Sequence, residues 1–89
     1  MRIRNYNNRG MAYCSKGEYD KAIADFSKAI QLDPNLAAVG YQNLGYAYKA
    51  LGMRAEAIAD FQKCIDLLQD HPSLIQATKQ EIKELRSSE

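Results

Sequence analysis

The chain has 89 residues, with 12 lysines and arginines, 11 aspartates and glutamates, and a formal net charge of +1. A chain of this length forms at most one domain, with a modest core. Its balanced charge argues against nucleic-acid binding, which needs a row of cations on one face, and its apolar runs are far shorter than the about 20 residues that cross a membrane. The two cysteines, Cys14 and Cys64, form no metal-ligand motif. We therefore expect a cytoplasmic protein with no cofactor, metal, nucleic-acid or membrane partner.

Two copies of one unit make up most of the chain. Residues 22–32 and 57–67 agree at eight of eleven positions, which sets the spacing between the copies at 35 residues. The same spacing relates further pairs, which are Tyr6 and Tyr41, Asn8 and Asn43, Gly10 and Gly45, Ala12 and Ala47, Tyr13 and Tyr48, and Gly17 and Gly52. Chance does not easily produce such agreement, so the chain is a repeat of two supersecondary units followed by a different tail.

The first copy predicts two helices, over 4–16 and 19–32. Tyr6, Gly10 and Tyr13 recur at helical spacing, and Gly17 ends the first helix because glycine closes the last turn without steric cost. The second helix has an apolar face formed by Ala22, Phe26, Ala29 and Ile30. Pro34 stops this pair, and Asn35 is a good N-cap for the next helix.

The second copy predicts helices over 36–51 and 54–69, and the tail predicts one over 73–86. The apolar face of the fourth helix comprises Ala57, Phe61, Cys64 and Ile65, so Cys64 is expected in the core. His71 precedes a proline at a helix start, where capping or loop packing is expected. The tail helix carries one apolar stripe and a polar outer face, as expected for a helix that closes a stack. The stripe comprises Leu74, Ile75, Thr78, Ile82 and Leu85.

Glycines at matching places in the two copies predict close helix packing. Gly10 and Gly45 have no Cβ, so the facing helix can approach their backbone, with Ala22 and Ala57 as the shallow opposing surface. The bulky rings fill the remaining space.

These residues together closely resemble the tetratricopeptide repeat. The first copy carries the resemblance in 8–13, 17–22, Phe26, Ala29 and 32–35, and the second in 43–48, Gly52, Ala57, Phe61 and Leu67. The resemblance implies an all-α fold in which antiparallel helix-turn-helix repeats stack as a right-handed α-solenoid of about five helices. A single domain, 1–89, would comprise repeat 1 (3–36), repeat 2 (37–71) and a capping helix (72–89).

The repeat departs from the family pattern at two places. The usual length is 34 residues, and the extra residue falls within 36–40, which predicts a bulge in the third helix or a late start. The second copy lacks the closing proline and continues to Asp70, His71 and Pro72, which leaves the angle of the last helix open.

By the same resemblance, the chain is a protein–protein interaction scaffold that binds a peptide or a partner helix in a concave groove lined by the first helix of each pair. Once the packing positions are set aside, the residues expected to face this groove are Arg4, Asn7, Asn8, Met11, Cys14, Ser15, Gln42, Asn43, Tyr46 and Lys49. The last helix could extend the surface with Gln76, Gln80 and Lys83. Amide side chains can pair with the backbone of a peptide, while Met11 and Tyr46 offer apolar contact. Arg4 and Lys49 favour an acidic segment or a terminal carboxylate.

Two other functions remain open. One is self-association through the uncapped first helix. The other is RNA binding of the pentatricopeptide kind, whose repeats also have 35 residues. An enzyme is not expected, because the chain has no convergent acid–base pair, no nucleophile beside an oriented base and no phosphate-binding loop.

Overall fold

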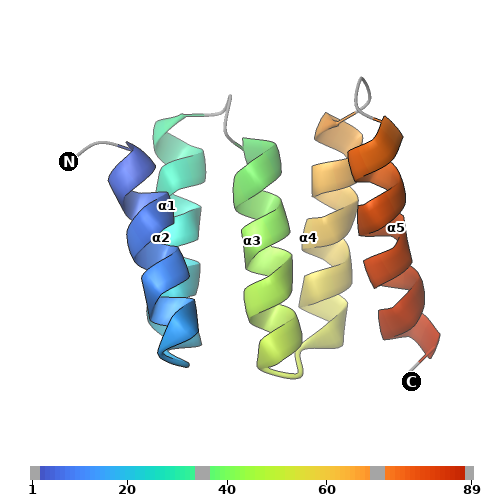
Figure 1. The fold of residues 1–89 in the computed structure, drawn as a ribbon, viewed down its shortest axis with the longest axis horizontal. Coiled ribbons are helices and arrows are strands. Elements are labelled where there is room, and N and C mark those ends of the chain that lie inside the picture. Colours follow the sequence, from blue (N-terminus) through green and yellow to red (C-terminus); the bar gives the residue numbers. More distant parts are fainter. Residues whose placement is uncertain (1–2, 34–36, 69–71, 88–89) are drawn as a thin grey trace.

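The computed structural model describes residues 3–33, 37–68 and 72–87, apart from the side chains of residues 3–5 and 74. Within these ranges the chain forms five α-helices, which are α1 (Ile3–Ser15), α2 (Tyr19–Leu32), α3 (Ala37–Ala50), α4 (Arg54–Leu67) and α5 (Pro72–Ser87). The helices stand in one antiparallel row in chain order (Figure 1), and the body measures 38 × 30 × 16 Å. The all-α class is confirmed, and each helix begins and ends within two residues of its predicted bounds. The roles expected of Pro34, Asn35 and His71 lie outside the described residues.

The turns between paired helices are set by two glycines with positive φ, Gly17 (79°) and Gly52 (77°). In the first turn the Glu18 N–H donates to the carbonyl of Tyr13 at 2.9 Å, and the Gly17 N–H donates to that of Cys14 at 3.0 Å. The second turn has the equivalent bonds at the same lengths. These bonds satisfy carbonyls that the helix end leaves unpaired, and the left-handed conformation that they require favours glycine. The predicted helix ends are therefore confirmed.

Glycine also allows the paired helices to approach each other. A Cβ on Gly10 would lie 2.6 Å from Cε1 of Phe26, and one on Gly45 would lie 2.5 Å from Cε1 of Phe61. Both rings are almost fully buried. The close approach is confirmed, although the atoms nearest these glycines belong to the phenylalanine rings rather than to Ala22 and Ala57.

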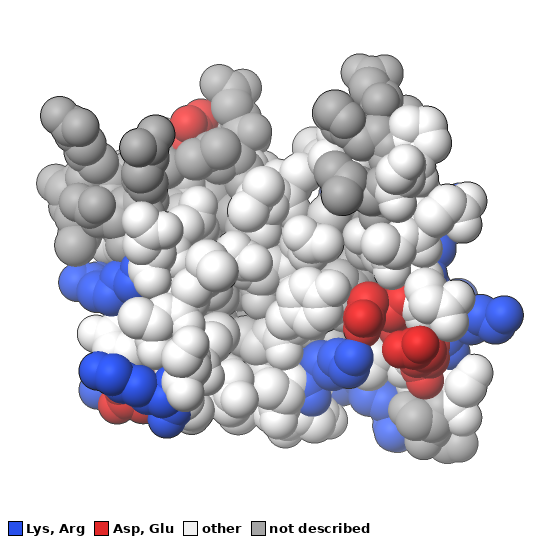
Figure 2. All heavy atoms as spheres, viewed as in Figure 1, with Lys and Arg blue, Asp and Glu red and all other residues white. Residues whose placement is uncertain are grey.

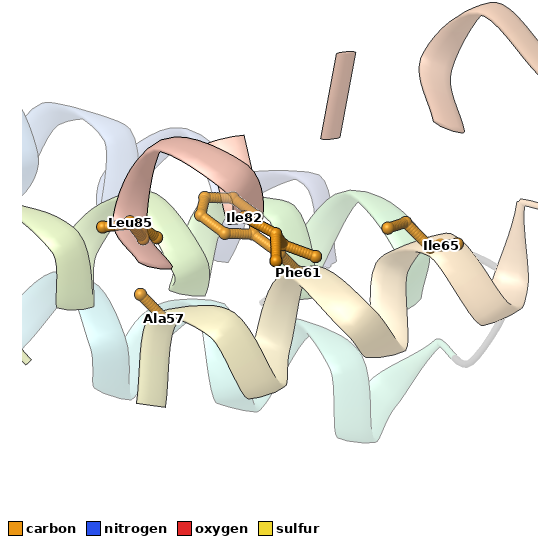
Figure 3. Close-up of a cluster of buried hydrophobic side chains, with 5 residues drawn as sticks. All are labelled: Ala57, Phe61, Ile65, Ile82 and Leu85. Carbon is orange, nitrogen blue, oxygen red and sulfur yellow. The ribbon is translucent and has the colours of Figure 1, made fainter. Parts of the chain in front are cut away.

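Two hydrophobic clusters form the core. The first joins the three N-terminal helices around Ala22, Phe26 and Leu44. The second joins α4 to α5, where Ile82 and Leu85 pack against the buried face of α4 (Figure 3). The residues drawn there are Ala57, Phe61, Ile65, Ile82 and Leu85. The half-buried ring of Tyr48 packs against both clusters, so the two repeats do not have separate cores. Cys64 is buried, as expected.

Helix α3 carries no bulge, because it continues as regular α-helix from Ala37, one residue after the predicted start, to Ala50. In the 35-residue register Ala37 lies one position before the equivalent of Ile3, where α1 starts, so α3 does not start late relative to α1. Gly40 faces Ile30 of α2 so closely that a Cβ there would collide with that side chain. The first turn of α3 therefore packs directly on α2, and Ala37 is buried there.

The buried carboxylate that occurs at the same position of both repeats has a different environment in each. Asp25 accepts two hydrogen bonds from the Arg9 guanidinium, at 2.7 and 2.8 Å. At the equivalent place of the second repeat, Leu44 stands where Arg9 stands in the first, and Leu44 packs into the core instead. Asp60, the counterpart of Asp25, is 9% exposed, and burial raises the pKa of its carboxyl despite the nearby Lys63.

None of the described helices is both long enough and apolar enough to cross a bilayer.

Candidate functional site

The residues expected to bind a partner lie on the exposed side of α1 and α3. Met11 and Tyr46 occupy equivalent positions of the two helices and are 56% and 44% exposed. The view in Figure 2 shows a broad uncharged area over α3, with cations toward the edge at α1 and a mixed group of charges over α5. We call the exposed side of these two helices the inner face. Its predicted residues in the described part are Asn7, Asn8, Met11, Gln42, Asn43, Tyr46 and Lys49.

Tyr46 is held in place although its ring is exposed. The ring packs edge-on against that of Phe61, with centroids 5.2 Å apart and planes at 79°. Partial burial raises the pKa of its hydroxyl, and the nearby Glu81 carboxylate adds to this effect. A tyrosine fixed by a buried ring loses little conformational entropy when a ligand packs on it.

Val39, which is 49% exposed, also belongs to this face, although it was not among the residues predicted from the sequence. It precedes Tyr46 by seven residues, which is about two helical turns, so the two side chains project from the same side of α3. The spacing alone could have identified it. Met11, Val39 and Tyr46 together give the inner face its apolar character.

Amide side chains accompany these apolar groups. Asn8 is exposed, while Gln42 and Asn43 are half-buried. Asn7 is also half-buried, and its Oδ1 atom is buried without a hydrogen-bond partner among the described residues. Buried acceptors are normally paired, so an unpaired one marks a place where a donor would be stabilising.

Lys49, one of the two cations predicted to attract an acidic ligand, is already paired. Lys49 Nζ donates to Glu81 Oε2 of α5 at 2.6 Å, and this bond raises the pKa of the lysine ammonium. The carboxylate cancels most of the positive charge that Lys49 would offer to a ligand. The inner face is therefore closer to neutral than the sequence suggests.

The remaining predicted residues are placed as follows. Arg4 lies in α1, and its side chain is outside the described part. Cys14 is half-buried, and burial raises the pKa of its thiol, which makes the thiolate less available. Ser15 is exposed and donates to the Met11 carbonyl at 3.2 Å. On α5, Gln80 donates to Glu84 at 3.3 Å, and Gln76 is exposed.

Lys83 lies apart from these residues, in a cleft on the side of α5 that faces away from Glu81. In the described part of the chain, no three histidine, cysteine or acidic side chains gather as a metal site would require. The inner face thus offers apolar contact and hydrogen bonding to a ligand.

Comparison with known proteins agrees with this architecture. The family described as "Tetratricopeptide repeat" matches residues 4–36 and 38–71, and α5 follows the second match, as a capping helix would. No curated protein matches the chain. The comparison found this repeat family and no catalytic family, and repeats of this kind are generally protein–protein interaction modules. Because the matches cover most of the chain and the helices pack as paired hairpins in sequence, the protein belongs to the tetratricopeptide repeat family.

Proposed function

We propose that this protein binds a peptide or helical segment of a partner protein on the inner face, and that the segment is mainly apolar or uncharged. The observation that carries the proposal is the exposure of Met11, Val39 and Tyr46 on two neighbouring helices. Apolar contact area of this kind, centred on an aromatic anchor, is typical of the core of a protein interface.

Polar groups around these side chains fit the backbone of such a segment. Amide side chains both donate and accept, so Asn8, Gln42 and Asn43 can pair with peptide N–H and C=O groups whatever the ligand's side chains are. The unpaired oxygen of Asn7 is an acceptor that a donor from the ligand would satisfy. The Lys49–Glu81 pair gives a strongly acidic ligand little advantage, because the Glu81 carboxylate offsets the attraction of the Lys49 ammonium.

A peptide-array screen with the purified protein tests this function. The array should contain apolar, neutral, acidic and basic segments, and hits should be measured in solution by fluorescence anisotropy. We expect apolar or neutral segments to bind, and Tyr46→Ala to weaken them about 30-fold, the effect of losing a residue that dominates an interface. Leu32→Ala is the matched control, because Leu32 is 47% exposed at the end of α2 and is not an inner-face residue. Equal binding by the wild type, Tyr46→Ala and Met11→Ala would show that the inner face is not the site.

Self-association is disfavoured at the α1–α2 end of the row. A second copy that docked there as α2 docks on α3 would have to cover the Arg9–Asp25 ion pair, where α3 offers Leu44. Covering charged groups costs solvation that the existing pair only partly offsets. Light scattering over a range of protein concentrations should therefore give a constant mass.

A further inference from the structure

A second surface with different chemistry lies between α4 and α5, at the C-terminal end of the row. It is a cleft of about 480 Å³ lined by one residue of α4, Gln62, and by five of α5. Three of those five are cations, Lys79, Lys83 and Arg86, which follow one another at helical spacing. With a rise of about 1.5 Å per residue, the row of cations spans roughly 10 Å.

The cations occupy the side of α5 that corresponds to the buried side of α1 and α3, the first helices of the two repeats. Thr78 is buried like Leu44, and Ile82 packs on α4 in the way that Tyr48 packs on α2, which aligns Lys79 with Gly45. In α3 that glycine receives the ring of Phe61 from the paired helix. A helix closing over α5 in the same way would meet the Lys79 side chain instead, and would bury its ammonium at a high cost in solvation. This side of α5 therefore stays open to a ligand that carries negative charge.

Charges on α5 are separated by side. Glu81 points to Lys49 on the inner face, and Glu84 accepts from Gln80. Within the described residues, none of the three cleft cations has a carboxylate partner. On α4, Asp66 accepts a hydrogen bond at 3.2 Å from Gln62, which lines the cleft. Like charges one turn apart, such as Lys79 and Lys83, destabilise a helix slightly, and a bound anion would relieve this repulsion.

We propose that this cleft binds an acidic peptide segment of a partner protein, independently of the inner face. Carboxylates spread along a peptide match cations spread over roughly two helical turns better than one compact anion does. The cleft also lies toward the C-terminal end of α5, where the helix dipole is negative and opposes a concentrated anionic charge. The lysine and arginine stems, with Ile82 beneath them, supply apolar contact for the ligand's methylene groups.

Fluorescence anisotropy with a short fluorescein-labelled polyglutamate peptide tests the proposal. Lys79→Glu combined with Lys83→Glu should weaken binding at least about tenfold, and raising the salt concentration should weaken binding to the wild type. The matched control combines Lys16→Glu with Lys28→Glu, which changes the net charge equally at exposed sites of the first repeat. This control and Tyr46→Ala should each bind within about twofold of the wild type, well below that tenfold loss.

Three results would overturn the proposal. The first is undetectable binding of polyglutamate by the wild type. The second is an equal loss in the cleft variant and in its charge-matched control, which would mean attraction by net charge alone. The third is displacement of polyglutamate by short RNA at lower concentration, which would assign the cleft to nucleic acid. The variant Lys79→Gln with Lys83→Gln, checked by circular dichroism, separates a loss of charge from a loss of folding. The Tyr46→Ala result keeps this test distinct from that of the inner face.

Discussion

Replacing Gly45 by valine tests the packing on which both repeats depend. The new Cβ would lie 2.5, 2.6 and 2.8 Å from the Cε1, Cδ1 and Cζ atoms of Phe61, well inside normal contact. The ring cannot easily turn aside, because it is fully buried and packs with Ile82 and Leu85. Overpacking of this kind costs about 1–3 kcal/mol, and the better helix propensity of valine returns less than about 0.5 kcal/mol. We expect a net loss of about 0.5–2.5 kcal/mol in the free energy of unfolding.

Urea denaturation followed by far-UV circular dichroism measures this loss directly. In a chain of this size about 1 kcal/mol corresponds to roughly 4–8 °C in Tm, so thermal melts should show the same ranking. The control is Ala59→Val at an exposed position of α4, which should cost only the propensity difference of about 0.5 kcal/mol.

A second variant tests the identity of the contact. If Val at position 45 strains the ring of Phe61, then Phe61→Leu should cost less in the Gly45→Val background than in the wild type, by about 0.5 kcal/mol or more. A Gly45→Val protein as stable as the wild type, or additive effects in the double variant, would refute the close contact between glycine and phenylalanine.

Three further predictions follow from single interactions. Gly52→Ala should cost about 1–2 kcal/mol through its positive φ, with Gly52→Asn costing less, as urea denaturation would show; equal stabilities would mean that the turn tolerates a side chain. Burial raises the pKa of Asp60 in the folded state. The stability that its carboxyl contributes is therefore present below the unfolded pKa of about 3.9 and is lost as pH rises through the folded pKa. Asp60→Asn should be more stable than the wild type at pH 7 and should lose this advantage at pH 3. A double-mutant cycle with Lys49→Met and Glu81→Gln should give a coupling energy of at most about 1 kcal/mol, because both side chains are partly exposed. In 1 M salt this coupling energy should fall to zero through screening, and a coupling energy that persists there would contradict the prediction.

The helices and their pairing could be predicted because the repeat itself encodes them. Gly17 and Gly52 mark the turns, and Phe26 and Phe61 recur where each glycine needs a facing ring. Two copies of the same pattern reinforce each other, so local signals were sufficient for helix bounds and for the core face.

Interactions that depend on the side of a helix were harder to predict. Lys49 was expected to attract an acidic ligand, yet it pairs with Glu81, which is distant in sequence and adjacent in space. Gly40 was included in the stretch with an inserted residue, and its contact with Ile30 emerges only when α3 is laid on α2. Arg9 likewise differs from its counterpart Leu44, because Arg9 pairs with Asp25 of α2 whereas Leu44 packs into the core. Such contacts require the relative rotation of neighbouring helices, which periodicity within one helix does not specify.

The position of Tyr48 against both hydrophobic clusters has a consequence for how the protein opens. Loss of either cluster removes packing from the other, so the two repeats should unfold together rather than one after the other. Helix α3, which is covered on both sides, should then keep its amide protons longest in hydrogen exchange, while the outer helices fray first. The boundary between the two sequence repeats lies between α2 and α3, but the cooperative unfolding unit extends across that boundary.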